Sequence, residues 1–410
     1  MKLGVIATCV VCAAATAWAA APPSCDGDQC SVVAHDEILS FHRVESLTLP
    51  RPVARVHRYS SASYSANDPN EDRFVVHVDG DTVYASVLDG HGGWQVSEYV
   101  NQHLVNNTKA RLRNRAQDIS NTEAIGEGLE EAFLDTEDAL RQKLLPAFEL
   151  GFGQVNRVGA CTMLAYLKED TLVVANAGDV RAVLGTTDAK GQLMAKAMST
   201  DHNAKHATEK ARLAAEHPNE SNIVVCQSPQ ACYVKGGLQP TRALGDFAFK
   251  YPEFNSFPAS IASSHRGGGR FIPDPYTPPY ILARPEVQSH VLTANDHFLV
   301  LGMSSTVSPL ITSRSTTGSD GLWDDVTNDE AVAIVHHYAS RGQHARAAQA
   351  LVEQVIANTA AEYQYVCESP GQVIATMRGR VNTARIASLS PGRDRRRVHD
   401  DTTVVVLFFS

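Results

Sequence analysis

Acidic residues recur in this sequence beside strand-like runs of apolar residues. Asp89 closes the run "TVYASVLD" and is followed by Gly90, His91 and two more glycines. A carboxylate at a strand end, next to glycines that allow close backbone approach, can hold a cation, and the Gly90 carbonyl would add an oxygen donor. Taken alone, "DGHGG" is equally compatible with a simple turn. The metal-site interpretation therefore depends on the other carboxylates.

Further carboxylates occupy similar places along the chain. They precede or follow apolar runs and are Glu71, Asp72, Asp179, Asp246, Asp320, Asp324, Asp325, Asp400 and Asp401. If strand ends meet at one edge of a sandwich, these side chains gather there. Two carboxylates ~4 Å apart repel by several kcal/mol at an effective dielectric of about 20, so such a cluster requires cations. Oxygen donors without a His or Cys set favour Mg²⁺ or Mn²⁺ over Zn²⁺.

Such a cluster predicts hydrolysis of a phosphate ester. Two bound ions lower the pKa of a bridging water and clamp the oxygens of an in-line phosphoryl displacement. His91, two residues from Asp89, is placed to protonate the leaving alkoxide. An isolated histidine in a turn more often makes a structural hydrogen bond, so this catalytic role depends on the cluster being real.

The elements that must position these residues follow from the apolar pattern. Strand-like runs joined by short turns, such as Asp79-Gly80-Asp81, predict antiparallel hairpins, and the helical patterns come in pairs. The predicted strands cover 74–79, 82–89, 161–167, 171–177, 181–185, 298–301 and 402–409, and the predicted helices cover 94–113, 122–144, 204–217, 328–339 and 345–361. This order predicts an α+β antiparallel sandwich with helices packed outside it.

Ordered motifs from about Ser65 to the C-terminus resemble the metal-dependent serine/threonine protein phosphatases of type 2C. The motifs are "NEDRF", "LDGHGG", "VVANAGDVRAVL", "STDHNA", "TRALGD", "SDGLWD" and "DDTTVVV". Within this family, "SANDPNEDR", "EHPNE" and "PPYILARPEV" resemble the catalytic subunit of pyruvate dehydrogenase phosphatase. The resemblance implies a four-layer α-β-β-α sandwich whose two central, mostly antiparallel sheets are flanked by helix pairs. It also implies a phosphoprotein substrate, attacked at phosphoserine or phosphothreonine by a metal-activated water at a binuclear Mg²⁺ or Mn²⁺ site.

The resemblance assigns roles to particular residues. Asp89 would bridge both metals, with Glu71 and the Gly90 carbonyl on one ion and Asp320 and Asp400 on the other.

Three further assignments complete the implied site. Asp179, together with Asp320, would form a third, weaker metal position, and His91 would be the general acid. Many relatives hold the substrate phosphate with an Arg just before the acidic pair. Here Asn67 stands nearby and Arg58 lies further upstream, so these two residues are the candidates.

The N-terminus predicts an address in the secretory pathway. Residues 1–20 combine one Lys, an apolar run and small residues in an A-x-A arrangement, which is typical of a signal peptide. We expect a leader over 21–55 and the phosphatase domain over 56–410. The family resemblance favours the mitochondrial matrix as the alternative. No other stretch approaches the ~18 apolar residues of a transmembrane helix, so none is expected in the mature chain.

Charge and cysteine content narrow the interpretation further. A net charge of −9 argues against a nucleic-acid partner, which needs a basic surface. The spacings Cys25/Cys30 and Cys226/Cys232 permit local disulfides in an oxidising compartment, and free thiols are the alternative. The oligomeric state cannot be predicted from this pattern.

A Ser/Thr-rich segment interrupts the expected junction between a strand and Asp320. Deleting residues 303–318 from "FLVLGMSSTVSPLITSRSTTGSDGLWDD" leaves "FLVLGSDGLWDD", the nearly continuous form that the family resemblance implies. The sixteen residues are either a surface insertion or a retained intron in the gene. If translated beside Asp320, they favour an alternative function, a catalytically impaired pseudophosphatase that acts as a scaffold.

Overall fold

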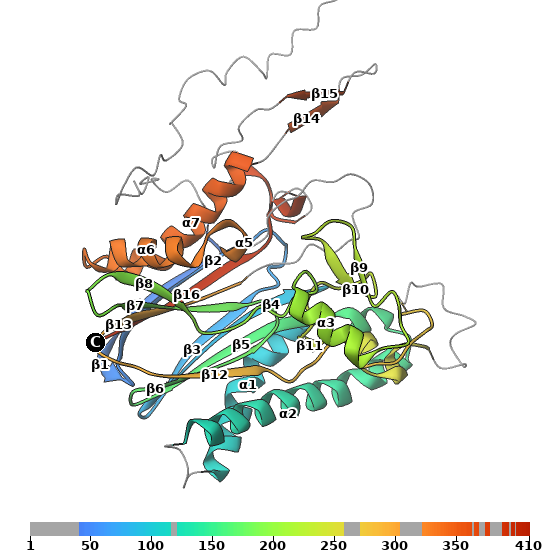
Figure 1. Ribbon diagram of the computed structural model, residues 1–410, viewed down its shortest axis with the longest axis horizontal. Helices are drawn as coiled ribbons and strands as arrows, with labels where there is room; N and C mark the ends of the chain where they lie inside the picture. Colours follow the sequence, from blue (N-terminus) through green and yellow to red (C-terminus); the bar gives the residue numbers. More distant parts are fainter. Residues whose placement is uncertain are drawn as a thin grey trace, which may run out of the picture. The chain divides into compact units, whose positions relative to one another are not determined.

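The computed structural model describes a sandwich of two antiparallel sheets (Figure 1). The described residues are 41–115, 121–257, 271–303, 322–362, 365–368, 374–377, 388–392, 395–397 and 399–410. The predicted signal peptide and all but the first residue of the segment 303–318 lie outside these ranges.

The first sheet has six strands in the order β1-β2-β16-β13-β7-β8. They are β1 (Arg43–Val53), β2 (Val56–Tyr64), β16 (Thr402–Phe409), β13 (Asp296–Gly302), β7 (Arg181–Thr187) and β8 (Leu193–Ala197). The run "TTVVVLFF" forms β16 because both of its faces are covered. Val404 and Val406 face the helices, and Val405 and Leu407 face the second sheet. Burying each such side chain contributes roughly 1.5–3 kcal/mol.

The second sheet follows the order β12-β6-β5-β4-β3, with a short β11 paired to β5. Its strands are β12 (Glu286–Val291), β6 (Thr171–Ala177), β5 (Gly159–Lys168), β4 (Thr82–His91), β3 (Arg73–Asp79) and β11 (Leu244–Gly245). The hairpins β3–β4 and β5–β6 are antiparallel, as their short turns predict.

Helices cover the outer face of each sheet. On the second sheet lie α1 (Gln95–Asn114) and α2 (Thr122–Glu149), and on the first lie α5 (Leu322–Asp325), α6 (Asn328–Ala339) and α7 (His344–Glu362). A capping box between Thr327 and Glu330 begins α6. The remaining elements include α3 (Ala207–Glu216), β9 (Val224–Cys226), β10 (Cys232–Val234), β14 (Tyr365–Glu368) and β15 (Ile374–Met377). The predicted four-layer α-β-β-α sandwich is confirmed, and no helix in the described ranges is long and apolar enough to cross a membrane.

The predicted leader over 21–55 extends too far toward the C-terminus. Residues 43–53 form β1, which pairs antiparallel with β2. From the sequence, Pro50 and Pro52 make a strand unexpected here. However, β1 is an edge strand, where proline is tolerated. The folded unit therefore begins before residue 56.

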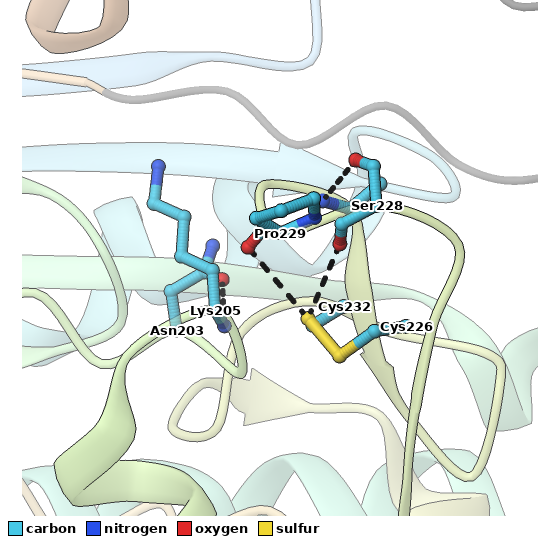
Figure 2. Close-up of a disulfide and its surroundings, with 7 residues drawn as sticks. Asn203, Lys205, Cys226, Ser228, Pro229 and Cys232 are labelled. Atoms are coloured by element: carbon cyan, nitrogen blue, oxygen red, sulfur yellow. Dashed lines mark hydrogen bonds between the residues drawn. A yellow bond between two sulfur atoms is a disulfide. The ribbon is translucent and has the colours of Figure 1, made fainter.

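The hairpin of β9 and β10 is closed by a disulfide between Cys226 and Cys232 (Figure 2). The two residues lie directly opposite each other in the strand register. Cys232 is buried and Cys226 is exposed. The predicted local pairing is thus confirmed for this pair, whereas Cys25 and Cys30 lie outside the described residues.

We expect the disulfide to stabilise this hairpin. Two strands of three residues are marginal by themselves. Closing so short a loop lowers the conformational entropy of the unfolded chain, which stabilises the folded state by about 2 kcal/mol. Limited proteolysis between residues 226 and 232 should accelerate in a Cys226→Ala/Cys232→Ala variant. Adding a dithiol should accelerate cleavage of the wild type but not of the variant. Equal cleavage rates in all samples would contradict this expectation.

Candidate active site

The antiparallel register brings the predicted carboxylates to one edge of the sandwich. The C-terminal end of β4 pairs with the N-terminal end of β5, where Asp89 lies opposite Cys161. In the other sheet, Thr402 at the start of β16 lies opposite Tyr64 at the end of β2. Since neighbouring strands alternate in direction, residues before β3 and β16 and residues after β6 reach the same edge. Glu71, Asp89, Asp179 and Asp400 are near one another there, because the charges of Asp179 and Asp400 act on Asp89 and the charge of Asp400 acts on Glu71.

Buried negative charges repel one another at this edge. Burial, followed by the charges of Asp72, Asp179 and Asp400, raises the pKa of Asp89 well above its usual range. Burial and the nearby carboxylates of Asp400 and Asp401 raise the pKa of Glu71 to about 7. The cluster therefore favours a positive charge among its members.

Asp401 ties the loop before β3 to the start of β16. Its Oδ1 accepts the backbone N–H groups of Ala66 at 2.6 Å and Asn67 at 2.8 Å, and its Oδ2 accepts that of Glu71 at 2.7 Å. The Asn67 side chain donates to Asp400 Oδ1 and to Asp401 Oδ2, both at 3.0 Å. The structure thus places Asn67 inside the cluster.

Arg396, which sequence reasoning missed, supplies a positive charge. Its Nη1 lies 2.5 Å from Asp400 Oδ2. The i to i+4 spacing in "RRRVHD" was the available signal, because it suits a short helical turn before β16.

The structure does not bring Arg58 to this edge. Arg58 lies opposite Phe408, six residues along β2 from Tyr64 and about 20 Å from the end of the strand at ~3.3 Å per residue. Its Nη1 lies 3.4 Å from His344 Nδ1. Arg58 is therefore not placed to hold a phosphate at the carboxylate cluster.

His91 is oriented by a second residue that sequence reasoning left without a role. His91 Nε2 lies 2.8 Å from Asp246 Oδ2, which leaves Nδ1 available to a substrate. Burial by itself lowers the pKa of His91, but the charges of Asp246 and of the cluster raise it on balance. A side chain at position 159 would collide with both His91 and Asp246, so Gly159 is required for this pair.

A buried ion pair holds the segment that carries Asp246. Glu137, on α2, accepts the Gly245 backbone N–H at 2.8 Å and Lys250 Nζ at 2.6 Å. Lys250 Nζ also donates to the Ala243 carbonyl at 2.6 Å. Both charged side chains are almost completely buried, so these mutual contacts fix the turn on either side of Asp246.

The Asn203 side chain holds the Asp179 carboxylate. Asn203 donates from Nδ2 to Asp179 Oδ2 at 2.8 Å. Burial raises the pKa of Asp179 to about 6. Within the described ranges, Asp179 Oδ1 is buried and has no hydrogen-bond partner, and the same holds for Asp246 Oδ1.

These donors fit a hard divalent cation. They are carboxylate oxygens, two of them are buried without partners, and a side chain at position 90 would strike the Glu71 carbonyl, so glycine allows the close backbone approach there. Within the described residues, however, no three His, Cys, Asp or Glu side chains lie close enough to hold one ion. Asp320, which the resemblance places on an ion, lies outside the described ranges.

Comparisons with known proteins agree on one family. A family model described as "Protein phosphatase 2C" matches residues 58–363. "Probable protein phosphatase 2C 42" of Arabidopsis thaliana is 30% identical over 352 residues, which are 86% of this chain and 78% of that protein. "Probable protein phosphatase 2C 72" of Oryza sativa subsp. japonica is 29% identical over 350 residues, which are 85% and 74% of the two chains.

Solved structures share the fold. The serine-threonine phosphatase 2C from Toxoplasma gondii has a TM-score of 0.56 at 17% identity and covers 89% of this chain and 99% of its own. A C. elegans sex determining protein has a TM-score of 0.54 at 15% identity, covering 86% and 64%.

Proposed function

Since the chain belongs to the protein phosphatase 2C family of metal-dependent serine/threonine phosphatases, we propose that its carboxylate cluster is the active site. The observation that carries this proposal is the convergence of Glu71, Asp89, Asp179 and Asp400 at one sheet edge. Two Mg²⁺ or Mn²⁺ ions, when bound, would supply an activated water and neutralise charge on the phosphate oxygens.

Most of the carboxylates at the edge would bind the metal ions. Asp89, Glu71, Asp400 and the Gly90 carbonyl would hold the two ions together with Asp320, as the family resemblance implies. Asp179 would contribute to the third position.

His91 and Asn67 would act on the substrate. His91 would donate a proton from Nδ1 to the leaving serine or threonine oxygen, because Asp246 holds Nε2. Asn67, whose amide already faces Asp400, would orient the phosphate.

Removal of divalent ions should abolish turnover. The ions contribute several kcal/mol of transition-state stabilisation, so release of phosphate from a phosphothreonine peptide should fall at least about a hundredfold in EDTA. Adding Mn²⁺ should restore it. If correctly folded protein released no phosphate at any Mn²⁺ concentration, the scaffold function would replace the enzyme function.

The compartment and the substrate are linked. The signal-like N-terminus, together with the Cys226–Cys232 disulfide, supports the secretory pathway, and there the substrate would be a secreted or lumenal phosphoprotein. The motif likeness to pyruvate dehydrogenase phosphatase supports a second candidate substrate, phosphorylated pyruvate dehydrogenase, which requires the mitochondrial matrix. Fusing the first ~40 residues to a fluorescent protein separates the two, because accumulation in the matrix would overturn the secretory address.

A further inference from the structure

Three basic side chains meet where β2 and α7 begin. Arg58 Nη1 lies 3.4 Å from His344 Nδ1, and the rings of His57 and His344 are 5.8 Å apart, edge to face. The His344 ring also packs against Phe408 at 4.7 Å. All three basic residues are half-buried, so a small solute can reach them. This basic cluster is at the opposite end of β2 from the carboxylate edge.

Three donor atoms at the basic cluster have no hydrogen-bond partner in the described part of the chain. Among the residues that the structure describes, Arg58 Nε and His57 Nδ1 are buried and make no hydrogen bond, and the same is true of Ser60 Oγ in a side chain that is 0% exposed. Arg58, Ser60 and Ala62 alternate along β2 and so share a face, and Ala62 packs in the core with α7. Ser60 therefore points toward the helix layer beside Arg58. Unpaired buried donors are costly, so this arrangement favours an acceptor.

The electrostatics at this place favour an anion. In the described part of the chain, no carboxylate pairs with Arg58 or His344. Burial, His344 and Arg58 lower the pKa of His57, and burial and Arg58 lower that of His344, although backbone hydrogen bonds to Phe408 and Phe409 and to Gly342 partly oppose these shifts. The charged groups that act on these rings are thus themselves basic. The N-terminus of α7, a helix of 19 residues that begins at His344, adds partial positive charge.

We propose that His57, Arg58, Ser60 and His344 form a second anion site, which binds a phosphate group. Guanidinium, imidazole and hydroxyl donors from two elements converge as a tetrahedral oxyanion requires, and a helix N-terminus strengthens such a site. The bound group is either inorganic phosphate or a phosphomonoester on a protein. The inference stands on this cluster alone and goes beyond the phosphatase function.

Histidine side-chain NMR tests the site directly. Full-length protein in EDTA, in which the carboxylate edge lacks its cations, is titrated with inorganic phosphate while the ring ¹⁵N resonances are followed. His57→Asn and His344→Asn variants assign the two resonances. Both should shift saturably in the wild type. Binding should weaken about tenfold or more in Arg58→Gln, because charge-assisted hydrogen bonds are lost. Arg51→Gln, which removes an exposed charge from the neighbouring strand, is the matched control and should bind like the wild type.

The outcomes separate the sources of phosphate. A phosphoserine peptide that competes with inorganic phosphate would identify a docking site for phosphorylated protein. If inorganic phosphate binds and the phosphoserine peptide does not compete with it, the site takes the free ion. Unshifted His57 and His344 resonances in tens of millimolar phosphate would overturn the proposal, as would equal affinity in folded Arg58→Gln and wild-type protein. Neither result would bear on the carboxylate edge.

Discussion

Replacing Asp89 by Asn is expected to lower kcat/KM for a phosphothreonine peptide on the order of a thousandfold in Mn²⁺. Asp89 is buried at the sheet edge, where the charges of Asp72, Asp179 and Asp400 all act on it. An amide keeps the size of the side chain but removes the charge that would attract the cations. Losing several kcal/mol of transition-state stabilisation has an effect of this size.

The stability of the Asp89→Asn variant distinguishes catalysis from folding. Without cations, the buried carboxylates repel one another, so removing one charge should not lower the thermal midpoint in EDTA. Added Mn²⁺ should raise the midpoint of the wild type more than that of the variant, because binding to the folded state stabilises it. Asp138→Asn, at an exposed position on α2, is the control and should retain wild-type activity. A variant that is folded and fully active would remove Asp89 from the active site.

Most strands could be predicted because their apolar runs are strong and their turns are short. The runs at 171–177 and 402–409 coincide with β6 and β16. In contrast, β1 carries two prolines and alternates weakly, and β8 to β10 have only three to five residues. Such strands are determined by pairing partners far away in the sequence, so local pattern cannot reveal them.

The candidate site was predictable where a residue's place along a strand determines its place in space. Glu71, Asp89, Asp179 and Asp400 are at strand ends, and antiparallel pairing brings strand ends together. The contact between Arg396 and Asp400 and the contact between His91 and Asp246 depend on loop geometry, which the sequence pattern does not show. The second contact also requires that position 159 be glycine. The prediction that Arg58 binds the phosphate was wrong for the converse reason. Arg58 is on β2, whose C-terminal end reaches the carboxylate cluster, but it lies at the opposite end of that strand.

Two hydrogen bonds join the residues on either side of the segment that interrupts the junction between β13 and Asp320. The Leu322 N–H donates to the Met303 carbonyl at 2.8 Å, and Trp323 Nε1 donates to the Gly302 carbonyl at 2.9 Å. The chain therefore departs from the end of β13 and returns to the same point. Met303, the first residue of the predicted insertion, is fully buried between the sheets, so the core already includes one residue of that segment.

Deleting residues 303–318 is expected to raise kcat/KM by about ten- to a hundredfold. The deletion joins Gly302 to Ser319 and sets one residue between β13 and Asp320. This spacing would hold the carboxylate rigidly at the sheet edge, and misplacing a catalytic group by about 1 Å can cost a hundredfold. Losing the buried Met303 should lower the thermal midpoint by a few degrees.

A second deletion, of residues 304–318, is the matched control. It removes the rest of the segment but keeps Met303, which shifts Asp320 by one residue. Because side chains alternate along an extended chain, this shift turns the carboxylate away, and activity should stay near that of the full-length protein. Equal activity in all three proteins would show that the segment does not disturb the site. A gain confined to the deletion of 303–318 would show that the distance from β13 to Asp320 controls catalysis, whether the sixteen residues are removed by splicing or retained in the protein.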